Sequence, residues 1–204
     1  MSGGAVILAR HGRPALSRRA MLNAEGYRDW WARYELGGLK SPQAPPADLV
    51  AMAGGAARAF SSVRRRSIES ARAVLGDRPF DSREDLIEAP LPPPPLPALV
   101  RLTPRLWGVL TRFCWWFFDH HDGAESRAEA EARAAAAATF LAKASEDGDV
   151  FVIAHGFFNA MIARVLEARG WRRTVDQGFK YWSARRFERP HAGTAALGEP
   201  GARG

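Results

Sequence analysis

Two histidines and two arginines stand at points in the chain where they could transfer a phosphoryl group. Arg10 and His11 follow one short apolar run, Arg66 follows a second, and His155 follows a third. A phosphoryl group in transfer carries negative charge on its equatorial oxygens, so positioning and cationic stabilisation supply most of the catalysis. Arginine offers a planar fork that binds two oxygens, and a neutral imidazole is a nucleophile. Taken singly each residue could be structural or solvated, but together these residue types could carry out phosphoryl transfer through a histidine.

Such a reaction also needs a carboxyl group. The leaving alkoxide takes a proton, and the water that attacks afterwards loses one, so a single carboxyl can serve as acid and then as base. Glu84, Asp85 and Glu88 are the candidates closest to a predicted strand end.

Short apolar runs alternate with helix-forming stretches and must position these side chains. The runs are apolar throughout rather than half polar, which predicts a mostly parallel sheet covered by helices on both faces, an α/β three-layer sandwich. Ligands of open α/β sheets bind beyond the carboxyl ends of the strands, where the candidate residues lie. The sequence predicts strands over 5–9, 59–61, 85–88 and 150–154, and helices over 22–36, 45–58, 66–75, 125–145 and 158–169.

Four segments together resemble the histidine phosphatase superfamily, also called the phosphoglycerate mutase-like family. Its mark is an Arg-His-Gly at the end of the first strand. The likeness extends from residue 5 to about residue 170 and rests on Arg10-His11-Gly12, on the block from Ser61-Ser62 through Arg66 to Ala71, on Glu125-Ser126 followed by Arg133, and on Ile153-Ala154-His155-Gly156.

The resemblance implies a phosphoglycerate mutase-like fold and a role for each motif residue. His11 would be the catalytic nucleophile, its ring oriented by a backbone carbonyl near Gly12. Arg10, Arg66 and His155 would bind the phosphate. No metal or other cofactor is implied.

The resemblance also favours one of the three carboxyl groups. The family's acid follows a Leu-x-Glu-like strand edge, which Leu86-Ile87-Glu88 reproduces. Glu88 is therefore the preferred second catalytic residue, with Glu84, Asp85 or an unassigned acid as the alternatives.

The substrate pocket departs from the family pattern. Many members follow the glycine with Glu or Gln, whereas this chain has Arg13 and then Pro14. Arg13, Asn23 and Trp107 are possible pocket residues, although the first two could simply lie at its rim. The aromatic segment 107–118 is expected to be core or a lid over the pocket rather than an interfacial membrane helix, and it suggests a substrate with an apolar portion.

The leading functional hypothesis is a metal-independent phosphomonoesterase that hydrolyses a small organic phosphate through phosphohistidine on His11. The alternatives are a catalytically weak or silent member that binds a phospholigand or a protein, and a phosphomutase. A length of 204 residues leaves little room for the insertions of true mutases, so a hydrolase is favoured.

Composition sets the remaining expectations. Residues 1–188 should form a single domain with a variable, lid-like segment at about 90–122, and residues 189–204 a disordered tail. A net charge of +7 suits an anionic ligand, and no nucleic-acid-binding motif accompanies it.

Because Cys114 is the single cysteine and no leader or membrane span is evident, the cytoplasm is the expected compartment. Asp119-His120-His121-Asp122 is interpreted as a solvated helix end rather than a metal site. The oligomeric state is not predicted.

Overall fold

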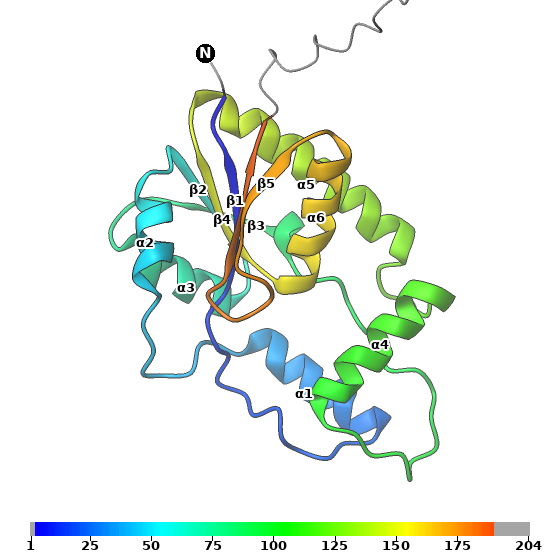
Figure 1. Cartoon of the computed structure of the whole chain (residues 1–204). Coiled ribbons are helices and arrows are strands. Elements are labelled where there is room, and N and C mark those ends of the chain that lie inside the picture. Colours follow the sequence, from blue (N-terminus) through cyan, green and yellow to red (C-terminus); the bar gives the residue numbers. More distant parts are fainter. Residues whose placement is uncertain (1–2, 190–204) are drawn as a thin grey trace, which may run out of the picture.

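Six strands form one mixed sheet in the computed structural model, which describes residues 3–189 (Figure 1). Their order across the sheet is β3-β2-β4-β1-β6-β5. The pairs β1–β4, β2–β4 and β2–β3 are parallel, whereas β6 runs antiparallel to both of its neighbours. The strands are β1 (Val6–Arg10), β2 (Arg58–Ser62), β3 (Asp81–Arg83), β4 (Val150–Ala154), β5 (Arg172–Asp176) and β6 (Ala184–Glu188).

The register of the central strands decides which polar residues meet. Arg10 is paired with Ala154 across β1 and β4, so His11 and His155 leave neighbouring strands at the same level. Ser61 of β2 is paired with Ile153 on the other side of β4. Three carboxyl ends therefore open onto one edge of the sheet.

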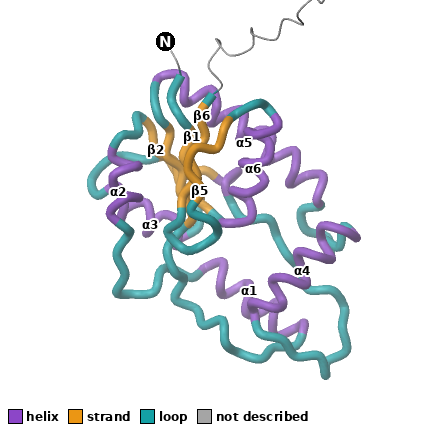
Figure 2. The backbone as a smooth tube through the Cα atoms, in the orientation of Figure 1, coloured by secondary structure: helices purple, strands orange, loops and turns teal. Residues whose placement is uncertain are grey.

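Helices cover both faces of the sheet (Figure 2). Two of them, α5 and α6, pack on one face, and α2 and α3 pack on the other. Beyond the carboxyl end of β1, α1 and α4 pack against each other through stacked aromatic rings (Figure 1). The helices are α1 (Ala24–Leu36), α2 (Ala47–Gly54), α3 (Arg65–Leu75), α4 (Pro104–Phe118), α5 (Arg127–Ala144) and α6 (Gly156–Ala168).

The two-sided core explains why Val6 to Ala9 of β1 and all of β4 are apolar. Alternate side chains of a strand point to opposite faces. Val6 and Leu8 pack against α5 and α6, whereas Ile7 and Ala9 pack against α2 and α3. The predicted architecture, a mostly parallel sheet between two helical layers, is confirmed.

Three details differ from the sequence-based expectation. The helix predicted over 45–58 is shorter, because α2 ends at Gly54 and Arg58 already begins β2. The third strand is β3 at residues 81–83, and the segment predicted as a strand edge at 85–88 begins instead as a 3₁₀ turn over Glu84–Leu86. The β5–β6 hairpin was not predicted. Because β5 is an edge strand whose residues are mostly exposed, its sequence Arg-Arg-Thr-Val-Asp lacks the apolar pattern of the central strands.

None of the helices within residues 3–189 is long and apolar enough to cross a membrane. Of the predicted tail at 189–204, all but Arg189 lies outside the described residues.

Candidate active site

His11 is almost completely buried at the end of β1, and its ring orientation is fixed by its own backbone. Nδ1 lies 2.7 Å from the carbonyl oxygen of Gly12. A carbonyl can only accept, so Nδ1 carries the proton and Nε2 keeps a free lone pair. The contact that the sequence analysis expected near Gly12 is therefore present.

The surroundings of His11 favour the neutral ring. Burial lowers its pKa well below the usual 6.5, and the positive charges of Arg66 and Arg10 lower the pKa further. The hydrogen bond to the Gly12 carbonyl acts in the opposite direction and is outweighed. Near neutral pH the imidazole is uncharged and able to attack.

Gly12 follows His11 and packs against the Trp182 ring. A Cβ at this position would come within 2.3 Å of the Trp182 ring and 2.8 Å of Gln43 Oε1, distances that no real side chain could tolerate. The Gly12 N–H donates to Ser70 Oγ at 2.9 Å, and this hydroxyl donates to the carbonyl of Arg66. The loop after His11 is thus tied to α3.

Arg66 is 1% exposed and held by α1. Its guanidinium donates to the carbonyl of Tyr34 and to Glu35 Oε1, and the ion pair with Glu35 measures 2.7 Å. Glu35 also pairs with Arg64 at 2.8 Å. A buried cation needs such a partner, because desolvation of an unpaired charge is costly. Glu35 therefore helps to position the arginine.

His155 lies beside His11, with 5.2 Å between the two ring centroids. Arg66 Nη2 donates to Nδ1 of His155 at 3.2 Å, so this nitrogen is the acceptor and Nε2 donates to Ser62 Oγ at 2.9 Å. Burial and the charge of Arg66 lower the pKa of His155 well below 6.5. Both ring nitrogens already have protein partners, and a direct contact from His155 to phosphate stays a prediction.

Arg10 approaches from the other side of the site. Its guanidinium carbon lies 4.5 Å from the centre of the Tyr181 ring, and Nη1 donates to the carbonyl of Phe179 at 2.5 Å. The Tyr181 ring centroid is 5.9 Å from that of His11. The loop before β6 therefore forms one wall of the site.

Glu88 caps the helix that begins after His155. Its carboxylate accepts hydrogen bonds from the N–H groups of Phe158 at 2.8 Å and Phe157 at 3.3 Å, in the first turn of α6. Gly156 precedes these residues and lies against the Arg10 side chain. The alternative Asp85 is instead paired with Arg83 at 2.7 Å. Glu88 is the one of the three that contacts the segment following His155.

Arg133 holds the segment that leads to Glu88. It donates to the carbonyls of Asp85 and Ile87, each at 2.9 Å, and its guanidinium forms two 2.7 Å bonds with the Glu125 carboxylate. Its carbon lies 3.8 Å from the centre of the Phe158 ring. The Glu125 to Arg133 motif thus positions the candidate acid.

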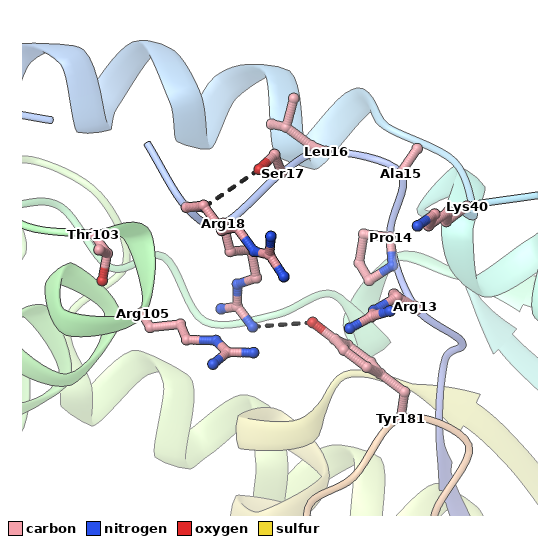
Figure 3. Close-up of a pocket in the computed structure, with 11 residues that line it drawn as sticks. Arg13, Pro14, Ala15, Leu16, Ser17, Arg18, Lys40, Thr103, Arg105 and Tyr181 are labelled. Carbon is pink, nitrogen blue, oxygen red and sulfur yellow. Dashed lines mark hydrogen bonds between the residues drawn. The ribbon is translucent and has the colours of Figure 1, made fainter. Parts of the chain in front are cut away.

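A cavity of about 620 Å³ opens next to these residues (Figure 3). Arg13 and Tyr181 line it, whereas Asn23 and Trp107 do not. Asn23 instead caps α1 by accepting from the Gly26 N–H. Trp107 is fully buried and donates to the Leu22 carbonyl. The expectation that Trp107 contacts substrate is therefore wrong, because the structure makes it a core residue.

The Asp119 to Asp122 segment is accounted for by contacts within the protein. The Asp119 carboxylate accepts from the Arg127 N–H, the rings of His120 and His121 face the carbonyls of Pro93 and Ala124, and Asp122 pairs with Arg28. Within residues 3–189 no cluster of three His, Cys, Asp or Glu side chains could hold a metal ion.

Sequence reasoning missed Glu35 and Tyr181. Glu35 lies in the last turn of a helix whose pattern gives no sign of the Arg66 pairing, and Tyr181 comes from a hairpin loop about 170 residues after His11. The order of the chain gave no signal for either contact.

Comparisons with known proteins agree on the fold. Residues 6–196 match the family model described as histidine phosphatase superfamily (branch 1). The Rv3214 product of Mycobacterium tuberculosis shares 17% identity at a TM-score of 0.60, over 93% of each chain. A mutant phosphoserine phosphatase from Entamoeba histolytica, solved with phosphoserine, shares 16% identity at a TM-score of 0.53, over 81% of this chain and 80% of that one. No curated protein matches this chain.

Proposed function

This chain belongs to branch 1 of the histidine phosphatase superfamily, and from that premise we propose that it is a metal-independent phosphomonoesterase acting on a small organic phosphate through phosphohistidine on His11. The observation that carries the proposal is the 2.7 Å bond from Nδ1 to the Gly12 carbonyl, which leaves Nε2 as a neutral nucleophile. Burial among arginines maintains that state.

In the first step Nε2 of His11 attacks phosphorus and the ester P–O bond breaks. Arg10 and Arg66 balance the charge on the equatorial oxygens, and the arrangement costs little reorganisation because Arg66 is already held in place by Glu35. Glu88 gives its proton to the departing oxygen.

In the second step water attacks the phosphorus of phosphohistidine and the N–P bond breaks. Glu88, now a carboxylate, accepts the proton from this water, which restores the acid for the next cycle. Inorganic phosphate leaves. A single carboxyl serves both steps, so no second base is required.

Two alternatives remain within the superfamily. A silent binding relative would keep the fold without the chemistry, and the retention of a complete nucleophile, cation and acid set argues against it. A phosphomutase would return the phosphoryl group to the substrate instead of to water. Release of free phosphate distinguishes the proposed phosphatase from both alternatives.

The first test is release of p-nitrophenol from p-nitrophenyl phosphate, with a chelator present, by the wild type and by His11→Ala. We expect turnover and an acid-labile phosphoprotein in the wild type, and neither in the variant. Turnover that persists in His11→Ala, or that disappears with the chelator, would refute the phosphohistidine route.

The second test concerns the acid. Glu88→Gln should accumulate phosphoenzyme, since hydrolysis of the N–P bond loses its base, and should slow an alkyl phosphate more than the aryl ester, whose leaving group needs less protonation. Glu84→Gln is the matched control, because Glu84 is exposed and four residues away. Equal effects of the two substitutions would remove Glu88 from the mechanism.

The compartment is part of the proposal too. The chain has a single cysteine and builds no internal disulfide, which suits a reducing cytoplasm.

A further inference from the structure

Among the described residues, five cationic side chains and no carboxylate line the cavity beside the candidate active site. Three come from the segment directly after His11, one from the loop after α1, and one from the first turn of α4. None of them forms an ion pair with an Asp or Glu in the part of the chain that the structure describes. They are Arg13, Arg18, Arg19, Lys40 and Arg105.

Tyr181 joins this cavity to the nucleophile. Its ring centroid lies 5.9 Å from that of His11. Its hydroxyl accepts a hydrogen bond from Arg18 Nη1 at 3.0 Å on the cavity side (Figure 3). The figure shows Arg13 and Arg105 directed toward the same space from different elements. A molecule bound at His11 would therefore extend directly among these cations.

The charge at this place exceeds what the transfer step uses. Arg10 and Arg66, whose charges act on His11, are the cations assigned to the transfer step. Five further cations that converge without acidic partners repel one another, and a concave surface of one sign concentrates the field for an anion. Most other arginines of the described chain are paired with carboxylates or carbonyls, so this cluster is a local exception rather than a consequence of the composition.

We propose that the substrate is a polyanion: a small phosphate ester that carries at least one further anionic group, a second phosphate or a carboxylate, bound by Arg13, Arg18, Arg19, Lys40 and Arg105. This inference rests on the proposed function and names its substrate class. The cavity volume of about 620 Å³ lies in the range of metabolite sites. The cations surround a cavity rather than forming a stripe, which favours a small molecule over a nucleic acid.

Binding can be tested separately from catalysis in the full-length His11→Ala variant. Calorimetry would compare three ligands with the same three-carbon chain: propyl phosphate, 3-phosphooxypropanoate and propane-1,3-diyl bisphosphate. The same titrations in Lys40→Gln/Arg105→Gln, made in the His11→Ala background, would remove two exposed cations of the cavity lining. Arg72→Gln is the matched control, because Arg72 is an exposed arginine on α3 away from the cavity.

We expect at least one of the two ligands with a second anionic group to bind about tenfold or more tightly than propyl phosphate, the effect of one favourable charge pair. The double substitution should reduce this preference at least about threefold, and Arg72→Gln should leave it unchanged. The carboxylate and bisphosphate arms identify which group the cavity selects.

Three outcomes would overturn the inference: equal affinity for all three ligands, a preference that survives the double substitution, or tighter binding of a single-stranded oligonucleotide. These outcomes are independent of the proposed function. If the protein prefers a polyanion but the wild type hydrolyses no ester, the ligand class stands and the phosphatase proposal fails. If the wild type hydrolyses the ester but shows no preference for a polyanion, the phosphatase proposal stands and the ligand class fails.

Discussion

Lowering the pH from about 7.5 to about 5.5 should destabilise this protein through two histidines of the site. His11 and His155 are 2% and 0% exposed, and burial together with the charge of Arg66 lowers the pKa of each well below 6.5. In the unfolded chain both histidines are protonated as the pH falls through about 6.5, whereas in the folded protein both stay neutral. The unfolded state then binds more protons, so the free energy of unfolding decreases.

The magnitude follows from the unfolded pKa alone, as long as the folded rings remain neutral. A histidine with an unfolded pKa of 6.5 that stays neutral in the folded protein lowers the free energy of unfolding by almost nothing at pH 7.5 and by about 1.4 kcal/mol at pH 5.5. Two such histidines lower the free energy of unfolding by about 2.7 kcal/mol across this range, a large part of the stability of an ordinary domain. Carboxyl groups with a lowered pKa, such as Asp176 with a pKa of about 2, change the free energy of unfolding at lower pH than this range.

The assay is urea denaturation at three pH values within this range. His11→Asn and His155→Asn should each reduce the pH-dependent loss to about 1.4 kcal/mol, since each removes one proton-binding site from the unfolded chain. His121→Asn, which removes a histidine outside the site, should leave the full loss. A free energy of unfolding that is flat or rises as the pH falls, or a loss unaltered in His155→Asn, would refute the reasoning.

Three further substitutions test how the site is positioned. Gly12→Ala should lower kcat at least about a hundredfold and stability by about 1–3 kcal/mol, because the new Cβ would overlap an indole ring; near-normal turnover would contradict this. Arg133→Gln should lower kcat for an alkyl phosphate about tenfold and for p-nitrophenyl phosphate less, since the segment before Glu88 loses two anchoring bonds; equal losses would indicate general unfolding. Glu35→Gln should lower the free energy of unfolding by about 1–3 kcal/mol in denaturation experiments. Saturating inorganic phosphate should reduce this loss, because it places negative charge near Arg66. A loss of stability that is independent of phosphate would contradict the pairing.

The sequence was sufficient to determine the central strands, the helical layers and the principal catalytic candidates. Val6 to Ala9 and Val150 to Ala154 are apolar at every position because each strand contacts helices on both faces, and a polar motif follows each run. Parallel strands bring their carboxyl ends to one edge, so His11 and His155 could be expected to meet. These features depend on local pattern and on one rule of topology.

The remainder depended on tertiary contacts between segments far apart in the chain. Trp107 has the sequence character of a pocket residue, yet it stacks on Tyr27 in the core. Glu35 reaches Arg66 because α1 packs beyond the sheet edge, and Tyr181 reaches His11 because an edge hairpin folds back over it. A cluster of cations around one cavity is likewise invisible in the sequence, because charged residues carry no periodic signal and the direction of each side chain is set by the element that holds it.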